Sequence, residues 1–343
     1  MGYTRRGMGD TAQLLGIIDR FAGTSVVLCG DLVLDRFILG TPKRISREAP
    51  VIILRHEAQH DVPGGGANAL ANIAALGARV TAVAAVGDDE PGEALRAALL
   101  ERGIDDGSIV TVAGYRTPTK VRVLGGGPSS LKHQVARYDI EDELQADGAW
   151  RGELDRHLAV AAAGAGAVAV SDYGYGCAPP EVVRSIISAA TGAWTCLDSR
   201  YRIGAFAGVG GATPNLEELE TFCGRPLPGD ADVAAGAEEL RRALGARFVL
   251  ATRGNRGMTL AEAGGARHIP VFGGDEVADV TGAGDTVLAV LTVALAAGAS
   301  PYEAACLANI GAGLVVMKLG TATVPAAELR AAVAAGGGSG DAP

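Results

Sequence analysis

The stretch Asp279-Val280-Thr281-Gly282-Ala283-Gly284-Asp285-Thr286 runs directly into the apolar segment 287–295. Two glycines flank Ala283, so the backbone can turn tightly with its N–H groups exposed. A helix that follows such a turn adds the positive end of its dipole. The stretch therefore predicts an anion site at a helix N-terminus, and phosphate is the anion that such turns most often hold.

Asp285 lies in the first turn of this predicted helix, where its carboxylate either caps the helix or takes part in chemistry. A carboxylate beside a phosphate cradle repels the phosphate unless it has another task. Accepting the proton of a hydroxyl that attacks phosphorus is such a task, so we interpret Asp285 as a general base. The competing interpretation is a dinucleotide-binding fingerprint, but its last glycine position is occupied by Val287 and the stretch lies near the C-terminus.

The same stretch resembles the second signature of the ribokinase-like (PfkB) carbohydrate kinases, Asp-Thr-x-Gly-Ala-Gly-Asp, with Val280 in place of the usual Thr. The resemblance implies an α/β fold with a doubly wound, mostly parallel sheet, helices on both faces and a small β-sheet lid. It implies ATP as co-substrate and Mg2+ as cofactor. It also assigns the catalytic roles, with the base at Asp285 and the anion hole at Gly282, Ala283 and Gly284. Some members bind a monovalent cation such as K+, whose ligands here would be Asp279 and Thr281.

Composition excludes several other classes of protein. The 343 residues are 48% hydrophobic and 20% charged, which fits a soluble globular chain of one large α/β domain or two small ones. A net charge of −9 argues against a nucleic-acid surface. The five cysteines are scattered without metal-ligand spacing, and a zinc site at His56 and His60 is disfavoured by their strand-like surroundings. No leader or long apolar run is recognised, so we expect a cytoplasmic protein without a membrane partner.

The N-terminal part carries candidate sugar ligands. Residues 25–30 predict a buried strand, and Asp31 and Asp35 follow it at the edge where parallel sheets bind ligands. Each of these two carboxylates either accepts hydrogen bonds from sugar hydroxyls or serves as a turn or helix-cap residue. A glycine turn at 63–66 then enters a small-residue helix, which begins near Asn68 and ends at Gly77. Both stretches resemble the family, and the glycine turn with its helix resembles the family's first signature. The resemblance implies sugar contacts at Asp35, Gly64, Gly65 and Asn68. The alternative for Asn68 is a helix-start residue.

Residues 37–62 and 111–139 show strand patterns rather than a helical period, and we predict that they form the lid. They carry basic residues that a neutral sugar does not require, so we predict an anionic sugar as substrate. Solvated charges on a strand face are the alternative. The surrounding sequence resembles one branch of the family, the heptose 7-phosphate kinases. The predicted phosphate ligands are Arg44, Lys120, Arg122 and Arg137.

From about residue 158, strands and helices alternate, and polar residues follow the strands. The resemblance implies a substrate contact at Asp172, whereas Tyr175 and Arg200 stand where the heptose branch has Lys, which leaves the sugar and its anomer open. Asn215 and Glu218 either form a helix capping box or hold Mg2+ through water, as the family motif Asn-x-x-Glu implies. Nucleotide contacts are implied at Asn215, Thr252, Gly254, Gly257 and Asn309.

We therefore expect one kinase domain over residues 11–330 and a disordered tail at 331–343, without the nucleotidyltransferase domain that is fused to some heptose kinases. The predicted reaction is ATP-dependent phosphorylation of D-glycero-beta-D-manno-heptose 7-phosphate at O1, which gives the 1,7-bisphosphate. One alternative is the same chemistry on ribose, fructose or a fructose phosphate. A non-catalytic sugar or nucleotide sensor on the same fold is a further alternative. We also expect a homodimer through the lid.

Overall fold

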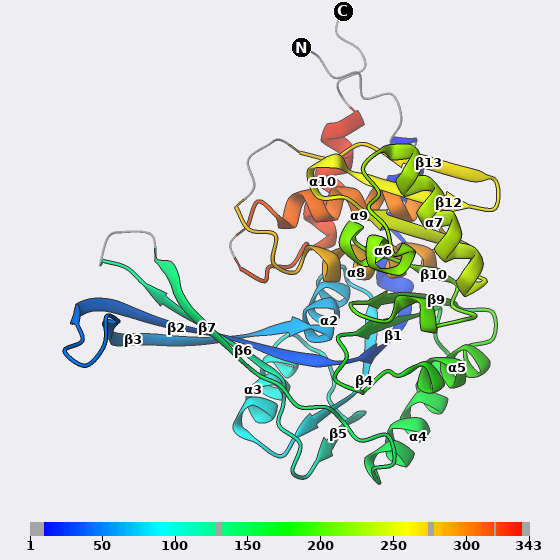
Figure 1. Cartoon of the computed structure of the whole chain (residues 1–343). Helices are drawn as coiled ribbons and strands as arrows, with labels where there is room; N and C mark the ends of the chain where they lie inside the picture. The colour runs from blue at the N-terminus through cyan, green and yellow to red at the C-terminus, as the bar shows by residue number, and fades with distance from the viewer. Residues whose placement is uncertain (1–9, 128–131, 274–277, 319, 338–343) are drawn as a thin grey trace, which may run out of the picture.

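The computed structural model describes residues 10–127, 132–273, 278–318 and 320–337. A large sheet forms the centre of the molecule, with its strands in the order β13-β12-β11-β10-β9-β8-β1-β4-β5 (Figure 1). In chain order these are β1 (Ser25–Gly30), β4 (Arg79–Gly87), β5 (Ile109–Val112), β8 (Ala167–Asp172), β9 (Trp194–Ser199), β10 (Gly211–Ala212), β11 (Phe248–Thr252), β12 (Met258–Glu262) and β13 (Gly265–Ile269). The strands from β5 to β11 are parallel, whereas β12 is antiparallel to β11 and β13 is antiparallel to β12.

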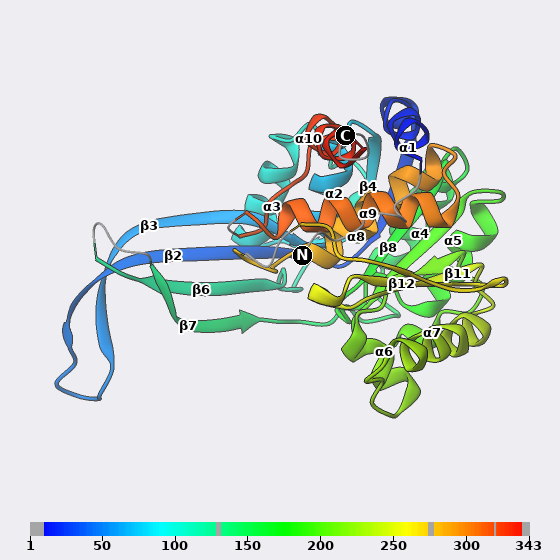
Figure 2. The same cartoon turned by 90° about the horizontal axis from the view of Figure 1, so that it is seen from above.

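Helices cover both faces of this sheet, as seen from above in Figure 2. They are α1 (Thr11–Ile18), α2 (Gly66–Ala75), α3 (Glu90–Leu100), α4 (Trp150–Ala162), α5 (Pro180–Ala189), α6 (Leu216–Cys223), α7 (Asp230–Leu244), α8 (Ala283–Ala296), α9 (Pro301–Val315) and α10 (Ala326–Gly337). Every residue of β8 is buried, which is the pattern of a parallel strand covered on both faces. The predicted doubly wound α/β fold is confirmed. None of the described helices has the length and apolar character needed to cross a bilayer.

Helix α8 is deeply buried. Its residues from Asp285 to Leu295 are all buried. It contacts α2 and α9 on one side and strands β8, β9 and β1 on the other. A helix that is apolar all round belongs in an interior, and burial here fixes the position of its N-terminus.

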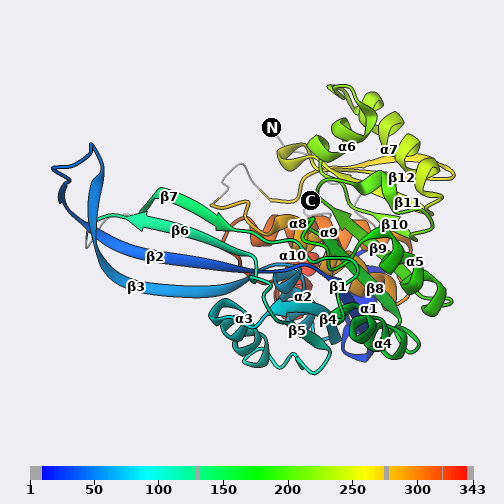
Figure 3. The same cartoon turned by 60° about the horizontal axis from the view of Figure 1, so that its bottom comes forward.

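A second, smaller sheet projects from the body as a long arm (Figures 1 and 3). Its strands are β2 (Leu32–Ile45), β3 (Ile52–Gly65), β6 (Thr119–Gly125) and β7 (His133–Ile140), in the order β3-β2-β6-β7. Both segments expected to form a lid contribute to it. The start of the second segment differs from the prediction, because residues 109–112 pair with β4 in the large sheet and the arm begins again only at Thr119.

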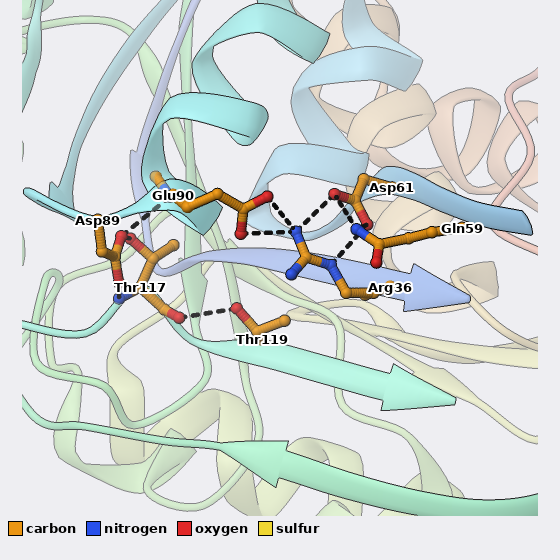
Figure 4. A network of polar contacts seen from close by, with 8 residues as sticks. Arg36, Gln59, Asp61, Asp89, Glu90, Thr117 and Thr119 are labelled. Carbon is orange, nitrogen blue, oxygen red and sulfur yellow. Dashed lines mark hydrogen bonds and ion pairs between the residues drawn. The ribbon is translucent and has the colours of Figure 1, made fainter. Parts of the chain in front are cut away.

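An ion-pair network fastens the root of the arm to the body (Figure 4). Arg36 of β2 donates two hydrogen bonds to Asp61 of β3, at 2.8 and 2.7 Å, and reaches Glu90 of α3 at 2.8 Å. The preceding residue, Asp89, caps α3 through the N–H of Gly92 and also accepts from the N–H of Thr117. Because these contacts join two strands of the arm to one helix, they orient the arm relative to the large sheet.

The predicted tail is wrong in part, because α10 extends to Gly337 and residues 331–337 are helical. Leu329 and Val333 are buried, and α10 packs on α1 and α9. Burial of this apolar face stabilises a helix that the alanine- and glycine-rich sequence did not reveal. Residues 338–343 lie outside the described part of the chain.

Replacing Leu329 by Ala tests the packing of α10. We expect a loss of about 2–5 kcal/mol of unfolding free energy, because a fully buried leucine leaves a cavity. Arg330→Ala is the matched control, since it removes only an exposed ion pair with Asp19, for which about 0–1 kcal/mol is typical. Urea unfolding of both variants is the measurement, and equal losses would contradict the packing described for α10.

Candidate active site

The turn at residues 282–285 has the backbone geometry of an anion site. Gly282 has a φ of 79°, and a Cβ at this position would lie 2.4 Å from Nδ2 of Asn68. Glycine is therefore required both by the conformation and by the close approach of α2. The N–H groups of the first turn of α8 have no acceptor inside the helix and carry the positive end of its dipole.

Asp285 lies within this first turn, and only 3% of its surface is exposed. The hydroxyl of Tyr173 donates to Oδ1 at 2.9 Å, and Nδ2 of Asn68 donates to Oδ2 at 3.0 Å. Burial raises the pKa of Asp285 to about 7, and the negative charge of Asp198 acts in the same direction. The two hydrogen bonds oppose this rise. A carboxyl that titrates near neutral pH can take up and release a proton, which a general base must do.

A cavity of about 480 Å³ opens in front of Asp285. Its wall combines the root of the small sheet, the carboxyl ends of β9 and β11, and the turn 280–285. These segments are far apart in the sequence, but the carboxyl ends of parallel strands meet at one edge of a sheet. Sequence-predicted residues that line this cavity are Asp35, Gly65, Lys120, Arg122, Arg137, Asn215, Glu218, Thr252, Thr281, Gly282, Ala283, Gly284 and Asp285.

A second cavity, of about 430 Å³, adjoins the first. The two share Thr252, Val280, Ala283 and Gly284, so the glycine turn lies at their junction. The second cavity is mostly apolar, and it is lined by side chains such as Met258, Val271, Phe272, Val287 and Val316. A flat apolar group with a charged extension could therefore fill the second cavity and reach the first along the turn.

Most of the predicted nucleotide residues line this second cavity: Thr252, Gly254, Gly257 and Asn309. Gly257 has a φ of 73°, and a Cβ there would lie 2.2 Å from the carbonyl oxygen of Ile269. Nδ2 of Asn309 donates to the carbonyl oxygen of Pro270 at 2.7 Å, which orients this amide at the cavity wall. Asn215 lines the first cavity instead.

The glycines of the first signature make room for the side chains of the site. A Cβ on Gly64 would lie 2.5 Å from Oδ2 of Asp35, so this carboxylate can occupy its place only beside glycine. Gly65 lines the cavity, whereas the amide of Asn68 is turned to Asp285. Asn68 therefore contacts the candidate base directly, a role that sequence reasoning did not foresee.

Three predicted phosphate ligands lie at the cavity, and each has an acidic neighbour. Arg122 forms an ion pair with Asp35 at 2.5 Å. Arg137 donates two hydrogen bonds to Asp139, at 2.8 and 2.6 Å. Nζ of Lys120 lies 3.9 Å from Asp139, and burial lowers the pKa of this lysine. A substrate phosphate would therefore have to share these cations with carboxylates.

Two residues that were predicted to contact the substrate, Arg44 and Asp172, line neither cavity. Arg44 is exposed and pairs with Ile53 near the end of β2, nine positions beyond Asp35, which corresponds to roughly 30 Å along a strand. Asp172 is buried and lines neither cavity. It accepts from the hydroxyl of Ser199 at 2.6 Å and from Arg202 at 2.7 Å, so it joins β8 to the segment after β9.

Both interpretations of Asn215 and Glu218 are compatible with the structure. The two residues form a capping box at the start of α6, with both hydrogen bonds at 2.9 Å. Both residues also line the first cavity. Burial raises the pKa of Glu218 to about 7, and the charge of Asp198 acts in the same direction. No cluster of three or more potential metal ligands occurs among the described residues, so a metal here would rely on water and phosphate ligands.

Asp279 accepts hydrogen bonds from the N–H groups of Thr281, at 2.9 Å, and Gly320, at 3.1 Å. It therefore joins the glycine turn to the segment after α9. Thr281 lines the first cavity. A monovalent cation at these two residues stays a hypothesis.

Sequence reasoning did not assign several cavity residues. Tyr173 follows β8, Asp198 lies near the end of β9, and Arg200 and Tyr201 follow β9. Asp139 and Glu141 lie at the end of β7. The sequence feature that could have identified these cavity residues is the presence of polar residues at the ends of strands. That signal did not distinguish Asp172, which faces the interior, from Asp198, which faces the cavity.

This arrangement, a glycine turn with a buried carboxylate between two cavities, agrees with the family whose signature the sequence resembles. The family model described as pfkB family carbohydrate kinase matches residues 24–147 and 200–328. The chain belongs to the pfkB family of carbohydrate kinases. The matched ranges contain the glycine turn before α8, the glycine turn at 63–66 and the loop 252–257.

Two curated relatives and one solved structure illustrate the similarity. The bifunctional protein HldE of Mesorhizobium japonicum is 40% identical over 92% of this chain, and that of Caulobacter vibrioides is 43% identical over 91%. The chain spans only 63% and 64% of the length of these two proteins. Phosphofructokinase-2 from Escherichia coli, crystallised with potassium, superposes with a TM-score of 0.74 at 22% identity, covering 91% of this chain and 99% of that one. At this level of identity, the likeness concerns the fold alone.

The change Glu218→Gln separates the capping and metal interpretations. The amide oxygen of Gln can still accept from the N–H of Asn215, so we expect an unchanged melting temperature. If the carboxylate also holds hydrated Mg2+, the Mg2+ concentration for half-maximal ADP release should rise several-fold, because one negative charge is lost. Glu217→Gln, an exposed neighbour on α6, is the control. An unchanged Mg2+ titration would leave Glu218 with a capping role alone.

Proposed function

We propose that this pfkB protein transfers the γ-phosphoryl group of ATP to a hydroxyl of a sugar phosphate. D-glycero-beta-D-manno-heptose 7-phosphate is the proposed acceptor, with phosphorylation at O1. The observation that carries the proposal is the buried Asp285, which lines the first cavity at the N-terminus of α8, beside the glycine turn that both cavities share. One cavity would hold the sugar and the other the nucleotide.

In the proposed mechanism, the ionised carboxylate of Asp285 accepts the proton of the attacking hydroxyl. The nucleophile then approaches the phosphorus in line with the leaving oxygen, over the turn formed by Gly282, Ala283 and Gly284. The N–H groups of this turn would stabilise the charge that develops on the transferred group, because they are fixed before the reaction begins. Asp35, beside Gly64, would accept hydrogen bonds from sugar hydroxyls.

ATP would place its adenine in the apolar second cavity, near Asn309 and the glycines of the 252–257 loop. Its phosphates would then extend over the turn toward Asp285. Bound Mg2+ would neutralise phosphate charge, and Glu218 and Asn215 would hold it through water. Asp279 and Thr281 are the residues that would bind K+, if a monovalent cation is used.

The heptose phosphate is favoured over a neutral sugar by two observations. Lys120, Arg122 and Arg137 line the sugar cavity, and a phosphate is the group that such cations recognise. The similarity to the HldE proteins fits the heptose kinase branch that the sequence motifs resemble. A cytoplasmic location follows from the proposed use of ATP. Another sugar or sugar phosphate on the same machinery is the alternative.

We also propose that two copies of the chain associate through the small sheet. Several large apolar side chains on the arm are exposed, among them Ile45 at 68%, Val51 at 55% and Tyr138 at 53%. A projecting sheet that exposes apolar side chains is a typical interaction surface, since a second copy would remove this area from water.

Replacing Asp285 by Asn tests the proposed base. We expect kcat to fall about 10²–10⁴-fold while both substrates still bind, because an amide cannot accept the proton. Since the carboxyl must be ionised and its pKa is raised to about 7, wild-type kcat should fall as the pH drops through about 7. The assay is coupled ADP release with heptose 7-phosphate, fructose 6-phosphate, ribose and fructose.

A kcat of the variant near that of the wild type would contradict the assignment of Asp285 as the base. Absence of turnover of every one of these sugars by the wild type would favour a non-catalytic sensor.

The change Arg137→Ala tests phosphate recognition. A charge-assisted hydrogen bond contributes about 1.5–3 kcal/mol, so KM for the sugar phosphate should rise roughly ten- to a hundredfold with little change in kcat. KM for the dephosphorylated sugar should stay the same. Arg44→Ala is the control on the same sheet, since this residue lies far from the cavity. Equal penalties on both sugars would mean that Arg137 serves only its ion pair with Asp139.

A further inference from the structure

Both oxygens of the Asp285 carboxylate are held by donors from separate parts of the fold. Tyr173, in the loop after β8, donates to Oδ1 at 2.9 Å, and Asn68 of α2 donates to Oδ2 at 3.0 Å. One donor on each oxygen fixes the plane of the carboxylate as well as its position. The lone pairs that remain are then directed in a constant way relative to the cavity.

Tyr173 is itself firmly placed. Its N–H donates to Oδ2 of Asp31 at 2.8 Å, and the same carboxylate accepts from the N–H groups of Tyr175, at 3.0 Å, and Cys177, at 2.9 Å. Asp31 is 2% exposed and follows β1, so a buried carboxylate holds the whole loop 173–177 against the sheet.

Gly65 completes this placement. A Cβ there would lie 3.2 Å from Cε2 of Tyr173 and 2.8 Å from Cγ2 of Val33. The tyrosine ring therefore packs directly over a glycine backbone, between the first signature and α8. The close packing of Tyr173 and Val33 therefore requires glycine at position 65, whether or not this residue also contacts a sugar.

We propose that Tyr173, held in place by Asp31 and Gly65, is a positioning residue that orients the Asp285 carboxylate for proton transfer, together with Asn68. This proposal rests on the proposed role of Asp285 as the base. A proton acceptor works efficiently only when its lone pair already points at the hydroxyl in the bound state, and a carboxylate held at one oxygen alone could rotate away.

The hydrogen bond from Tyr173 also affects the charge state of the base. It favours the ionised carboxylate, so its removal should raise the pKa of Asp285 further above its ordinary value. The other groups that act on Asp285 are Asp198 of β9 and Asp35 of β2, whose negative charges raise its pKa, and Asn68, whose hydrogen bond lowers it. None of these three is altered by a change at Tyr173.

The experiment compares Tyr173→Phe with Tyr175→Phe. Tyr175 belongs to the same loop, but its hydroxyl donates to Glu141 at 2.6 Å and does not contact Asp285. Each protein carries 13C-labelled aspartate, and the Asp285 carboxyl resonance is identified by its loss in Asp285→Asn. Its titration is followed by NMR, and kcat and KM for ATP are measured across the same pH range. The NMR titration needs no turnover, so it reports on the contact whatever the substrate is.

In Tyr173→Phe we expect the titration midpoint and the acidic limb of kcat to move up by about one pH unit. From titration alone, a shift from about 7 to about 8 lowers kcat at pH 7 roughly fivefold. We expect a further loss on the high-pH plateau, where the carboxylate is ionised in both proteins, and an unchanged KM for ATP. Tyr175→Phe should leave the midpoint where it is.

An unmoved midpoint in Tyr173→Phe, or an equal shift in Tyr175→Phe, would overturn the proposal. So would a plateau kcat equal to that of the wild type, because the tyrosine would then tune charge without positioning the base. If Asp285→Asn retains full activity, the proposed base is wrong and the positioning role falls with it. If that variant is inactive and Tyr173→Phe shows no shift, the base stands and only this inference fails.

Discussion

The burial of α8 is the constraint on which the site depends. Because residues 285–295 are enclosed by α2, α9 and three strands of the large sheet, the start of the helix cannot move relative to the sheet edge. Asp285 is thereby held away from water, which would be costly for a carboxylate without partners. Donors from Tyr173 and Asn68 offset part of that cost, and the balance leaves a carboxyl that titrates near neutral pH. The packing of an apolar helix thus determines the electrostatics of the residue at its end.

The first cavity carries more acidic than basic side chains. Its carboxyl groups are Asp35, Asp139, Glu141, Asp198, Glu218 and Asp285, and its cations are Lys120, Arg122, Arg137 and Arg200. Burial raises the pKa values of Asp198, Glu218 and Asp285. The negative charge of Asp198 adds to the rise at Glu218 and at Asp285, and that of Asp172 adds to the rise at Asp198. Such a surplus of negative charge opposes the binding of phosphates alone, and a divalent cation that arrives with them would relieve it. The proposed need for Mg2+ therefore depends on all the carboxylates of the cavity and not only on the Asn-x-x-Glu motif.

The two ends of the small sheet differ in what they contribute: the root supplies residues of the first cavity, and the tip supplies an exposed surface. At its root, Arg36 joins β2 and β3 to α3, so the cavity residues Asp35, Lys120 and Arg122 keep a defined position over the large sheet (Figure 4). Toward its tip, the strands extend beyond the body (Figure 3). Apolar and basic side chains of this part of the arm are exposed. A strand advances about 3.3 Å per residue, so the nine positions between Asp35 and Arg44 separate these two residues by roughly 30 Å along β2. This is why Arg44 and Asp35 belong to different environments although one strand carries both.

The features that the sequence determined by itself are those set within a few residues of the chain. The boundaries of β1, the glycine turn before α8 and the capping box at Asn215 depend on local backbone preference and on hydrogen bonds across three or four positions. The tertiary structure alone decided which polar groups meet. Tyr173 and Asp285 are 112 positions apart, and Arg122 and Asp35 are 87 apart. Asp172 and Asp198 both end parallel strands, yet only Asp198 faces the cavity, and α10 is stable where composition indicated a tail. Such outcomes depend on how strands and helices pack against one another, and that packing is a property of the whole chain that no local pattern contains.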